Sequence, residues 1–199
     1  MKKDCFSIRR ASVQDAAALL EIYTPFVVSE DRALSDVSFE YEAPSVEEFA
    51  GRIKHISASY PYLVCELDGK PVGYAYAHPY IERDAYQWGA EVTIYLSPAA
   101  QGKGVGRRLY IVLEKILRLQ NVLTCYACVT ASNEHSVKMH EALGYHIAGS
   151  FKNAGFKHGH WLNMVWLEKQ LAAYPENPEP FKSINQVEQA KVEAIVTNG

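Results

Sequence analysis

The sequence predicts an α/β (α+β) fold in one main domain, built as a mixed β-sheet with helices over its faces. Two observations support this prediction. Short segments rich in β-branched and aromatic residues alternate along the chain with segments whose apolar residues recur every three or four positions. In addition, 48% of the 199 residues are hydrophobic, which is enough to bury one substantial core.

The first half of the chain is expected to form three strands and two helices. In order, the predicted elements are a strand at residues 7–10, a helix that begins within residues 12–15, a helix capped at Ser45 that runs to about Ser57, and strands at residues 62–66 and 72–78. Asp68-Gly69 is a turn signal that joins the last two strands as a hairpin. Pro25 is expected to perturb or end the first helix because it lacks a backbone N–H. Residues 29–44 are expected to form a long loop beside a binding site.

The second half is expected to add four strands and two helices. In order, these are a strand at residues 89–96, a helix at 105–120, a strand at 122–129, a helix at 133–143, and strands near 145–151 and 161–168. In the helix at 105–120, Leu109, Leu113 and Ile116 recur at the spacing of one helical face. We therefore expect a domain over residues 1–170 and a C-terminal extension over residues 171–199. The extension is either an arm docked on the domain or on another subunit, or partly disordered.

A glycine-rich turn links the strand at 89–96 to the helix that follows. Its glycines and cations are Gly102, Gly104, Gly106, Lys103, Arg107 and Arg108. Glycines let the backbone approach a ligand closely, and the first turn of a helix offers unpaired N–H groups and a partial positive charge. These properties suit a phosphate. Arg107 stands where a dinucleotide fingerprint needs its last glycine, and no Gly-Lys-Ser/Thr sequence supports a nucleotide P-loop. The remaining alternative is a turn that only reverses the chain.

Charge, cysteine and histidine content narrow the class of protein. With 20 basic and 23 acidic residues, the net charge of -3 argues against general nucleic-acid binding. No run of 18 apolar residues and no apolar signal segment is present, so we expect a cytoplasmic protein without a membrane partner. Cys125 and Cys128 lie three residues apart in a predicted strand and point to opposite faces, so we expect no metal there. The pair His158 and His160 is more typical of a loop or strand edge than of a metal site.

Two separated motifs resemble the GNAT superfamily of acetyl-CoA-dependent N-acetyltransferases. One is the Gln-x-x-Gly-x-Gly turn that begins at Gln101, and the other is a helix that begins at Asn133 and ends in Leu143-Gly144-Tyr145. The resemblance covers residues 7–170. Within the superfamily, residues 38–40, 85–91, 140–145 and 157–161 resemble the phosphinothricin and methionine sulfoximine acetyltransferase branch. That branch acetylates the α-amine of small amino-acid-like molecules.

The resemblance implies a GNAT fold, a strongly twisted mixed sheet of about seven strands flanked by about four helices, which opens between its fourth and fifth strands. Acetyl-CoA would lie in that gap as the acetyl donor, and no metal is implied. The strand backbone would hold the pantetheine arm, the glycine turn the pyrophosphate, and the helix after Asn133 a further part of the cofactor. The implied cofactor-binding residues are Ile94, Tyr95, Leu96, Gln101, Gly102, Lys103, Gly104, Val105, Gly106, Arg107, Asn133 and Ser136.

Glu91 and His140 are the catalytic candidates. An alkyl amine is mostly protonated at neutral pH, so a base must accept its proton before it can attack a thioester. Glu91 matches the base that the family is proposed to use; the alternative is a strand-end glutamate in a salt bridge or in solvent. His140 stands where many members of the superfamily place a tyrosine, so it is a candidate acid or thiolate partner. The alternative for His140 is a helix histidine that bonds a neighbour. A backbone N–H at Tyr95 or Leu96 is the candidate donor to the developing oxyanion.

The substrate-binding candidates come from separate segments of the chain. They are Phe39, Tyr80, Arg83, Tyr86, Glu91 and His160. Arg83 offers a cation for a substrate carboxylate, and Phe39 and Tyr86 could supply aromatic walls. Ile81 stands where relatives can carry a basic side chain, so the identity of the amine stays open.

Together these features predict a cytoplasmic enzyme that transfers an acetyl group from acetyl-CoA directly to the amine of a small amino-acid-like molecule, with Glu91 as general base. The branch resemblance also implies a homodimer. Two alternatives remain. One is a protein or peptide N-acetyltransferase, which needs an open groove for its substrate. The other is a non-catalytic acyl-CoA-binding sensor, for which Glu91 beside the gap would be a coincidence.

Overall fold

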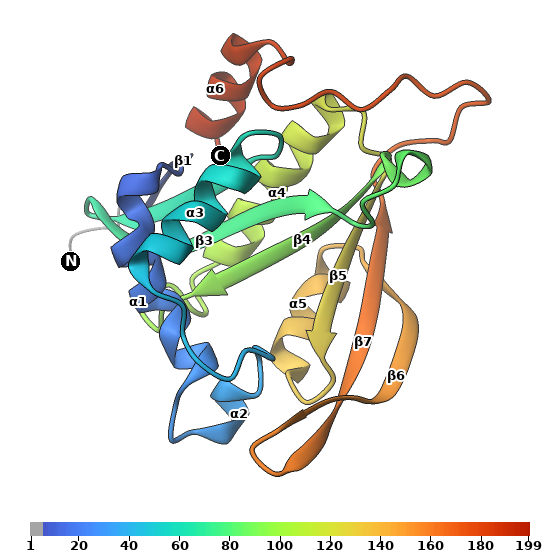
Figure 1. Ribbon diagram of the computed structural model, residues 1–199. Helices are drawn as coiled ribbons and strands as arrows, with labels where there is room; N and C mark the ends of the chain where they lie inside the picture. The colour runs from blue at the N-terminus through green and yellow to red at the C-terminus, as the bar shows by residue number, and fades with distance from the viewer. Residues whose placement is uncertain (1–5) are drawn as a thin grey trace.

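The computed structural model describes residues 6–199, and a mixed sheet of seven strands organises them (Figure 1). The strands are β1 (Phe6–Arg10), β2 (Tyr62–Leu67), β3 (Lys70–Pro79), β4 (Gly89–Leu96), β5 (Thr124–Thr130), β6 (His146–Lys157) and β7 (His160–Gln170). Their order across the sheet is β1-β2-β3-β4-β5-β7-β6. Every neighbouring pair is antiparallel except β4 and β5. The mixed sheet expected from the sequence is therefore confirmed.

Six helices pack around this sheet in the described part of the chain. They are α1 (Ala16–Val27), α2 (Arg32–Ser35), α3 (Val46–Ser57), α4 (Val105–Leu119), α5 (Glu134–Ala142) and α6 (Gln189–Thr197). Helices α1 and α3 cover one face and α4 covers the other (Figure 1). Alternate residues of β2 therefore enter two cores: Tyr62 and Val64 pack with α1 and α3, whereas Leu63 and Cys65 pack on the α4 side. Within residues 6–199, no helix is both long enough and apolar enough to cross a membrane.

Three local differences from the sequence expectations have physical reasons. Helix α1 continues past Pro25, because a proline in the last turn removes only one hydrogen bond. Residues 29–44 contain the single turn of α2, where the Asp31 side chain accepts a backbone hydrogen bond at the helix start. Strand β5 begins at Thr124 and not at residue 122, because Asn121 adopts a positive φ of 65° as the chain turns out of α4.

Strands β4 and β5 separate soon after they meet. Their parallel pairing covers only Gly89 to Glu91 of β4 and Thr124 to Tyr126 of β5. Beyond Glu91, β4 keeps its antiparallel pairing with β3 as far as Leu96. Figure 1 shows the resulting V between the two strands. The expected opening between the fourth and fifth strands is confirmed, and it positions the site described below.

The tail after β7 crosses back over the molecule and ends in α6 (Figure 1). Five of its side chains are buried in the core that contains α4, namely Leu171, Ile184, Val187, Val192 and Val196. Arg108 of α4 donates a hydrogen bond to the Gly199 carbonyl oxygen at 2.5 Å, and the Gln120 side chain donates to the Lys182 carbonyl at 2.8 Å. In the structure the tail therefore docks on helix α4 of its own chain. The division into residues 1–170 and 171–199 stays a prediction.

Candidate active site

A cavity of about 640 Å³ lies where the open end of β4 meets the glycine turn. We call it the turn cavity; its walls are β4, the turn before α4, the start of α5 and the segment around α2. Eleven of the twelve residues expected to bind the cofactor line it: Ile94, Tyr95, Leu96, Gln101, Gly102, Gly104, Val105, Gly106, Arg107, Asn133 and Ser136. Lys103 is the exception, and its ammonium nitrogen lies 5.8 Å from the centre of the Phe6 ring.

The glycines of the turn are required by backbone conformation. Gly102 and Gly104 have φ values of 69° and 76°, a region that residues with a side chain rarely adopt. An added Cβ would meet no other heavy atom within 4 Å at either position, so conformation and not crowding requires glycine. Helix α4 follows directly, and its first bond runs from the Arg108 N–H to the Gly104 carbonyl at 3.1 Å. The N–H groups before Arg108 lie at the positive end of the helix dipole.

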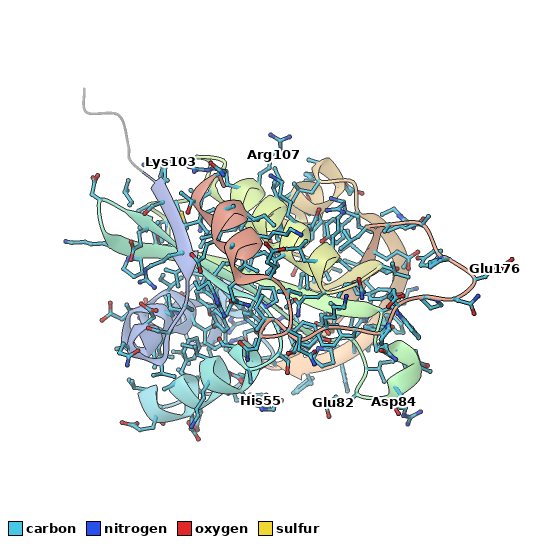
Figure 2. The ribbon with its side chains drawn as sticks, turned by 90° about the horizontal axis from the view of Figure 1, so that it is seen from above. His55, Glu82, Asp84, Lys103, Arg107 and Glu176 are labelled. Atoms are coloured by element: carbon cyan, nitrogen blue, oxygen red, sulfur yellow. The ribbon has the colours of Figure 1, made fainter. Side chains whose placement is uncertain are left out.

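Two of the three cations of the turn, Lys103 and Arg107, lie on one edge of the molecule (Figure 2), and Arg108 contacts the tail. Arg107 is exposed at the start of α4, and Figure 2 shows it on the same edge of the molecule as Lys103. Arg108 turns away and bonds Gly199 at the end of the described chain. The wall of the turn cavity therefore offers backbone N–H groups, a helix N-terminus and Arg107. This combination fits the pyrophosphate of a coenzyme A ester.

The gap between β4 and β5 holds a second, smaller cavity of about 70 Å³. We call it the splay cavity, and it lies between residues 92–95 of β4 and residues 127–130 of β5. Because β5 has diverged, the backbone N–H and C=O groups of β4 on this side have no strand partner, which suits an extended ligand that pairs like a strand. Val37, Ile94 and Tyr95 line both cavities, so the two spaces are neighbours.

Glu91 lies at the last β4–β5 pair before the gap. It stands opposite His78 of β3, and the Glu91 Oε2 to His78 Nε2 distance is 3.9 Å. Its side chain is 20% exposed; burial raises the pKa of Glu91, and the charge of a protonated His78 lowers it. His78 Nδ1 donates to the Pro79 carbonyl at 3.0 Å, because a carbonyl can only accept, and Nε2 is left facing Glu91. A half-buried carboxylate with a raised pKa is chemically suited to accept a proton.

His140 is buried at the wall of the splay cavity. Its Nδ1 donates to the Ser136 carbonyl at 2.7 Å, and its Nε2 lies 2.9 Å from the Tyr110 hydroxyl. Burial lowers the pKa of His140, which favours the neutral ring. In that ring Nε2 carries no hydrogen, so Tyr110 donates and His140 accepts. Tyr110 was not among the sequence candidates, because its place in the helix pattern is that of a core residue.

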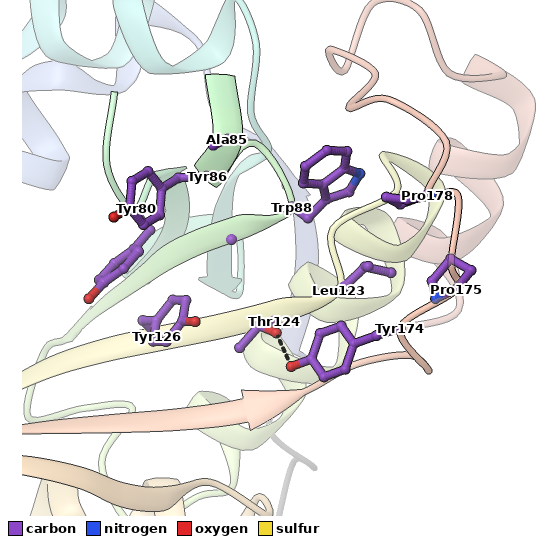
Figure 3. Close-up of a pocket in the computed structure, with 11 residues that line it drawn as sticks. Tyr80, Ala85, Tyr86, Trp88, Leu123, Thr124, Tyr126, Tyr174, Pro175 and Pro178 are labelled. Atoms are coloured by element: carbon purple, nitrogen blue, oxygen red, sulfur yellow. Dashed lines mark hydrogen bonds between the residues drawn. The ribbon is translucent and has the colours of Figure 1, made fainter. Parts of the chain in front are cut away.

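Two of the substrate-binding candidates, Tyr80 and Tyr86, line an aromatic pocket of about 270 Å³ (Figure 3). Tyr80 stacks on Tyr126 with ring centroids 4.0 Å apart. Tyr174 of the tail lines the other side of the pocket. Because Tyr126 pairs with Glu91 across the β4–β5 ladder, the aromatic pocket begins beside the catalytic candidate.

The other substrate-binding candidates lie elsewhere. Arg83 lines a separate cavity of about 660 Å³, which His78 also lines. Phe39 packs over strand β6, and His160 Nε2 lies 3.0 Å from Asp36 Oδ2. The structure therefore does not bring the six candidates into one pocket; it distributes them around the face of the sheet that carries Glu91.

A polar cluster on this face was missed by sequence reasoning. Arg52 Nη2 lies 2.7 Å from Glu40 Oε1, and the Tyr23 hydroxyl donates to Glu40 Oε2 at 2.9 Å. Burial is the main cause that raises the pKa of Tyr76, and the charges of Glu91 and Glu40 add to it, so Tyr76 lies near both carboxylates. These residues meet through strand pairing and helix packing, and no local sequence pattern marks them.

The cysteines and histidines do not gather into a metal site in the part of the chain that the structure describes: no group of three or more His, Cys, Asp or Glu could hold an ion there. Cys125 is a free thiol buried in the core, and Cys128 is a free thiol at the splay cavity. Burial raises the pKa of Cys128 to about 12, so this thiol is neutral and a weak nucleophile.

Comparisons with known proteins agree with this geometry. Residues 8–166 match the family described as "Acetyltransferase (GNAT) domain". The chain is 33% identical to a phosphinothricin N-acetyltransferase of Streptomyces viridochromogenes, over 90% of this chain and 95% of that protein. It is 29% identical to an L-methionine sulfoximine/L-methionine sulfone acetyltransferase of Salmonella typhimurium, over 83% and 94% of the two chains. A crystal structure of a GNAT superfamily phosphinothricin acetyltransferase from Sinorhizobium meliloti in complex with acetyl-CoA superposes with a TM-score of 0.79 at 31% identity, covering 90% of this chain and 98% of that one.

Proposed function

Because this chain belongs to the GNAT acetyltransferase family, we propose that it transfers an acetyl group from acetyl-CoA to the amine of a small amino-acid-like molecule, with Glu91 as general base. The observation that carries the proposal is the meeting of the turn cavity, the splay cavity and Glu91 at one opening of the sheet. The substrate class is supported by relatives named for phosphinothricin and methionine sulfoximine. When bound, acetyl-CoA supplies the electrophilic thioester carbonyl.

Backbone groups, more than side chains, would bind acetyl-CoA. The unpaired edge of β4 at residues 94–96 would hold the pantetheine arm, and the turn at residues 102–107 would hold the pyrophosphate. Asn133 caps α5 by accepting a hydrogen bond from the Ser136 N–H at 3.2 Å, which places both residues at the cavity wall. A backbone N–H of β4 at Tyr95 or Leu96 would stabilise negative charge on the carbonyl oxygen during attack.

On the acceptor side, Glu91 accepts a proton from the substrate ammonium, either directly or through water. Its raised pKa makes the carboxylate a better base than an exposed glutamate. His78 stands next to it with a side chain that is 32% exposed, so it offers a path for that proton to solvent. The amine then attacks the thioester without an acyl-enzyme, which agrees with the neutral thiol of Cys128.

We propose that His140 positions a neighbouring side chain and does not act as a direct acid. Acting as a direct acid would require the imidazolium form, which burial disfavours. The hydrogen bond from Tyr110 to His140 instead supports a role in which His140 orients the Tyr110 hydroxyl at the splay cavity. The departing thiolate needs little assistance, because a thiol titrates at about 8.5 and its anion is a good leaving group.

The test is CoA-thiol release with a panel of amino-acid analogues, measured on the wild type and on Glu91→Gln. We expect turnover to fall by on the order of a hundredfold at neutral pH, with partial recovery at high pH, where the amine loses its proton unaided. Glu47→Gln, at an exposed position of α3, is the matched control and should behave like the wild type. Unchanged turnover in Glu91→Gln would remove it as the base. Tight acetyl-CoA binding with no turnover on any amine would favour the sensor alternative, and a preference for peptides would favour a protein acetyltransferase.

We further propose that the chain acts as a homodimer. Support comes from aromatic side chains left exposed on the β6–β7 ribbon, namely Phe151, Phe156 and Trp161. Light scattering should give twice the mass of one chain, and a monomer at micromolar concentration would count against the proposal.

A further inference from the structure

Lys157, at the end of β6, is a buried lysine that the reaction proposed above does not use. Only 2% of its surface is exposed. Its Nζ donates to three carbonyl oxygens, those of Val27 at 3.0 Å, Ser35 at 2.6 Å and Ser38 at 2.7 Å. An ammonium group has three N–H donors, so all of them are matched within the protein.

Two of the three carbonyls lie at the C-terminal ends of helices, where a carbonyl needs a donor from outside the helix. Val27 is the last residue of α1, Ser35 is the last residue of α2, and Ser38 lies in the loop that follows. Carbonyls at the C-terminus of a helix have no partner within the helix and carry partial negative charge, so a cation stabilises them. Burial lowers the pKa of Lys157, and the charges of Asp36 and Glu40 oppose that effect. A neutral apolar side chain here would leave three buried acceptors without this donor.

Further contacts around Lys157 join residues 35–36 to the turn between β6 and β7 and to the end of β5. The His158 ring lies 3.1 Å from the Ser35 hydroxyl, and the His160 ring lies 3.0 Å from the Asp36 carboxylate. The Thr130 hydroxyl donates to the Asp36 carbonyl at 2.9 Å. Figure 1 shows α2 beside the turn between β6 and β7. Lys157 is the buried centre of this joint, and the histidines lie toward its surface.

The loop that the joint holds forms a wall of both cavities. Asp31, Ala33 and Leu34 line the turn cavity, and Val37 lines the turn cavity and the splay cavity. Val37 stands between Ser35 and Ser38, whose carbonyls both bind the lysine. The Lys157 ammonium therefore bonds the backbone on both sides of Val37.

We propose that Lys157 is a positioning residue for acetyl transfer, which fixes residues 35–38 so that Val37 closes the splay cavity around the thioester end of the donor. This inference rests on the proposed function. Two of the three donors of the lysine go to residues 35–38 and the third goes to the end of α1, so the wall is held by the protein itself. Donor binding then spends little free energy on ordering the loop, and the thioester meets a wall of fixed shape.

The test compares Lys157→Met with Lys152→Met. The first variant keeps most of the aliphatic stem and removes the ammonium; the second alters an exposed lysine of the same strand and is the control. In Lys157→Met we expect the dissociation constant for acetyl-CoA to rise about tenfold, kcat to fall, and amide hydrogen exchange to accelerate at residues 35–38 but not in α4. A purely structural role would lower the melting temperature of Lys157→Met and leave the dissociation constant of the folded protein unchanged. That result would overturn the proposal.

A variant that fails to fold does not end the test. Lys157→Gln keeps two N–H donors and should lie between the wild type and Lys157→Met in acetyl-CoA affinity. In the wild type, the Asp36 and Val37 amides, which bond to Arg32 and Leu34 carbonyls at 2.8 and 3.2 Å, should be protected from exchange before acetyl-CoA is added. Free exchange that stops only after acetyl-CoA binds would contradict the proposal. Absence of acetyl-CoA binding by the wild type would reject the proposed function, while exchange at residues 35–38 in Lys157→Met would still report on the joint.

Discussion

Glu91 and His78 form one cross-strand pair, and a positive charge on His78 changes the proton affinity of Glu91. Burial raises the pKa of Glu91 because the charged carboxylate loses solvation, whereas a protonated His78 at 3.9 Å favours the charged form. The hydrogen bond from His78 Nδ1 to the Pro79 carbonyl fixes the ring so that Nε2 faces the carboxylate. Burial therefore makes Glu91 a stronger base, and a neighbour that no motif marks moderates that effect.

Replacing His78 by Gln should move the acidic limb of the pH–rate profile to higher pH. In the proposed mechanism Glu91 acts as the carboxylate, so activity is lost as the pH falls through its pKa, and a protonated His78 lowers that pKa. Without the cation the pKa of Glu91 rises further, and the loss begins at a higher pH. The measurement is kcat/KM against pH for the wild type, His78→Gln and the exposed control His146→Gln. An acidic limb that stays in place, or moves to lower pH, would show that His78 does not act on the base.

Elements with a strong local pattern were predictable from the sequence. Strand β4 has the bounds expected from its β-branched run, and the periodicity of α4 placed its start at Val105. The pairing of His78 with Glu91 was not predictable, because the loop between β3 and β4 is not a short turn that sets register. Helix α2 was missed because a single turn carries no periodicity and is held by Lys157, far along the chain. Strand β6 was expected to end near residue 151 but continues to Lys157 past a register shift between Phe151 and Gly155.

A glycine in the turn and a glycine in helix α3 should respond in opposite ways to replacement by alanine. Gly104→Ala should destabilise the fold by about 1 kcal/mol, because its φ of 76° disfavours a side chain although space is open around it. Gly51→Ala, inside α3 with equally open space and no positive φ, should stabilise the fold by about 0.5–1 kcal/mol. Urea unfolding measures both, and acetyl-CoA affinity should fall only in the first variant. Equal effects on stability would show that the turn conformation does not require glycine.

The whole molecule divides the proposed chemistry between the two sides of its sheet. One core lies against α4 and the tail, and the other lies between the sheet, α1 and α3. Ile94, Leu96 and Val105, which are proposed to bind the donor, pack on the first core, whereas Tyr95, Glu91, His78 and the Arg52–Glu40 pair lie on the second face. The two sides connect where β4 and β5 part, which is the proposed site of transfer. The tail stabilises this arrangement because it packs on α4, the helix whose N-terminus forms the glycine turn.

Val192→Ala tests whether the tail belongs to this folding unit. Val192 of α6 is fully buried in the core with α4, so its truncation should lower the free energy of unfolding by about 2 kcal/mol through lost burial and an unfilled space. Val46→Ala, at an exposed helical position in α3, is the matched control and should change stability by less than about 0.5 kcal/mol. If residues 171–199 were only an arm beside a self-sufficient domain, both variants would unfold at the same urea concentration. A single transition that shifts only in Val192→Ala would show that residues 1–170 depend on the tail for their stability.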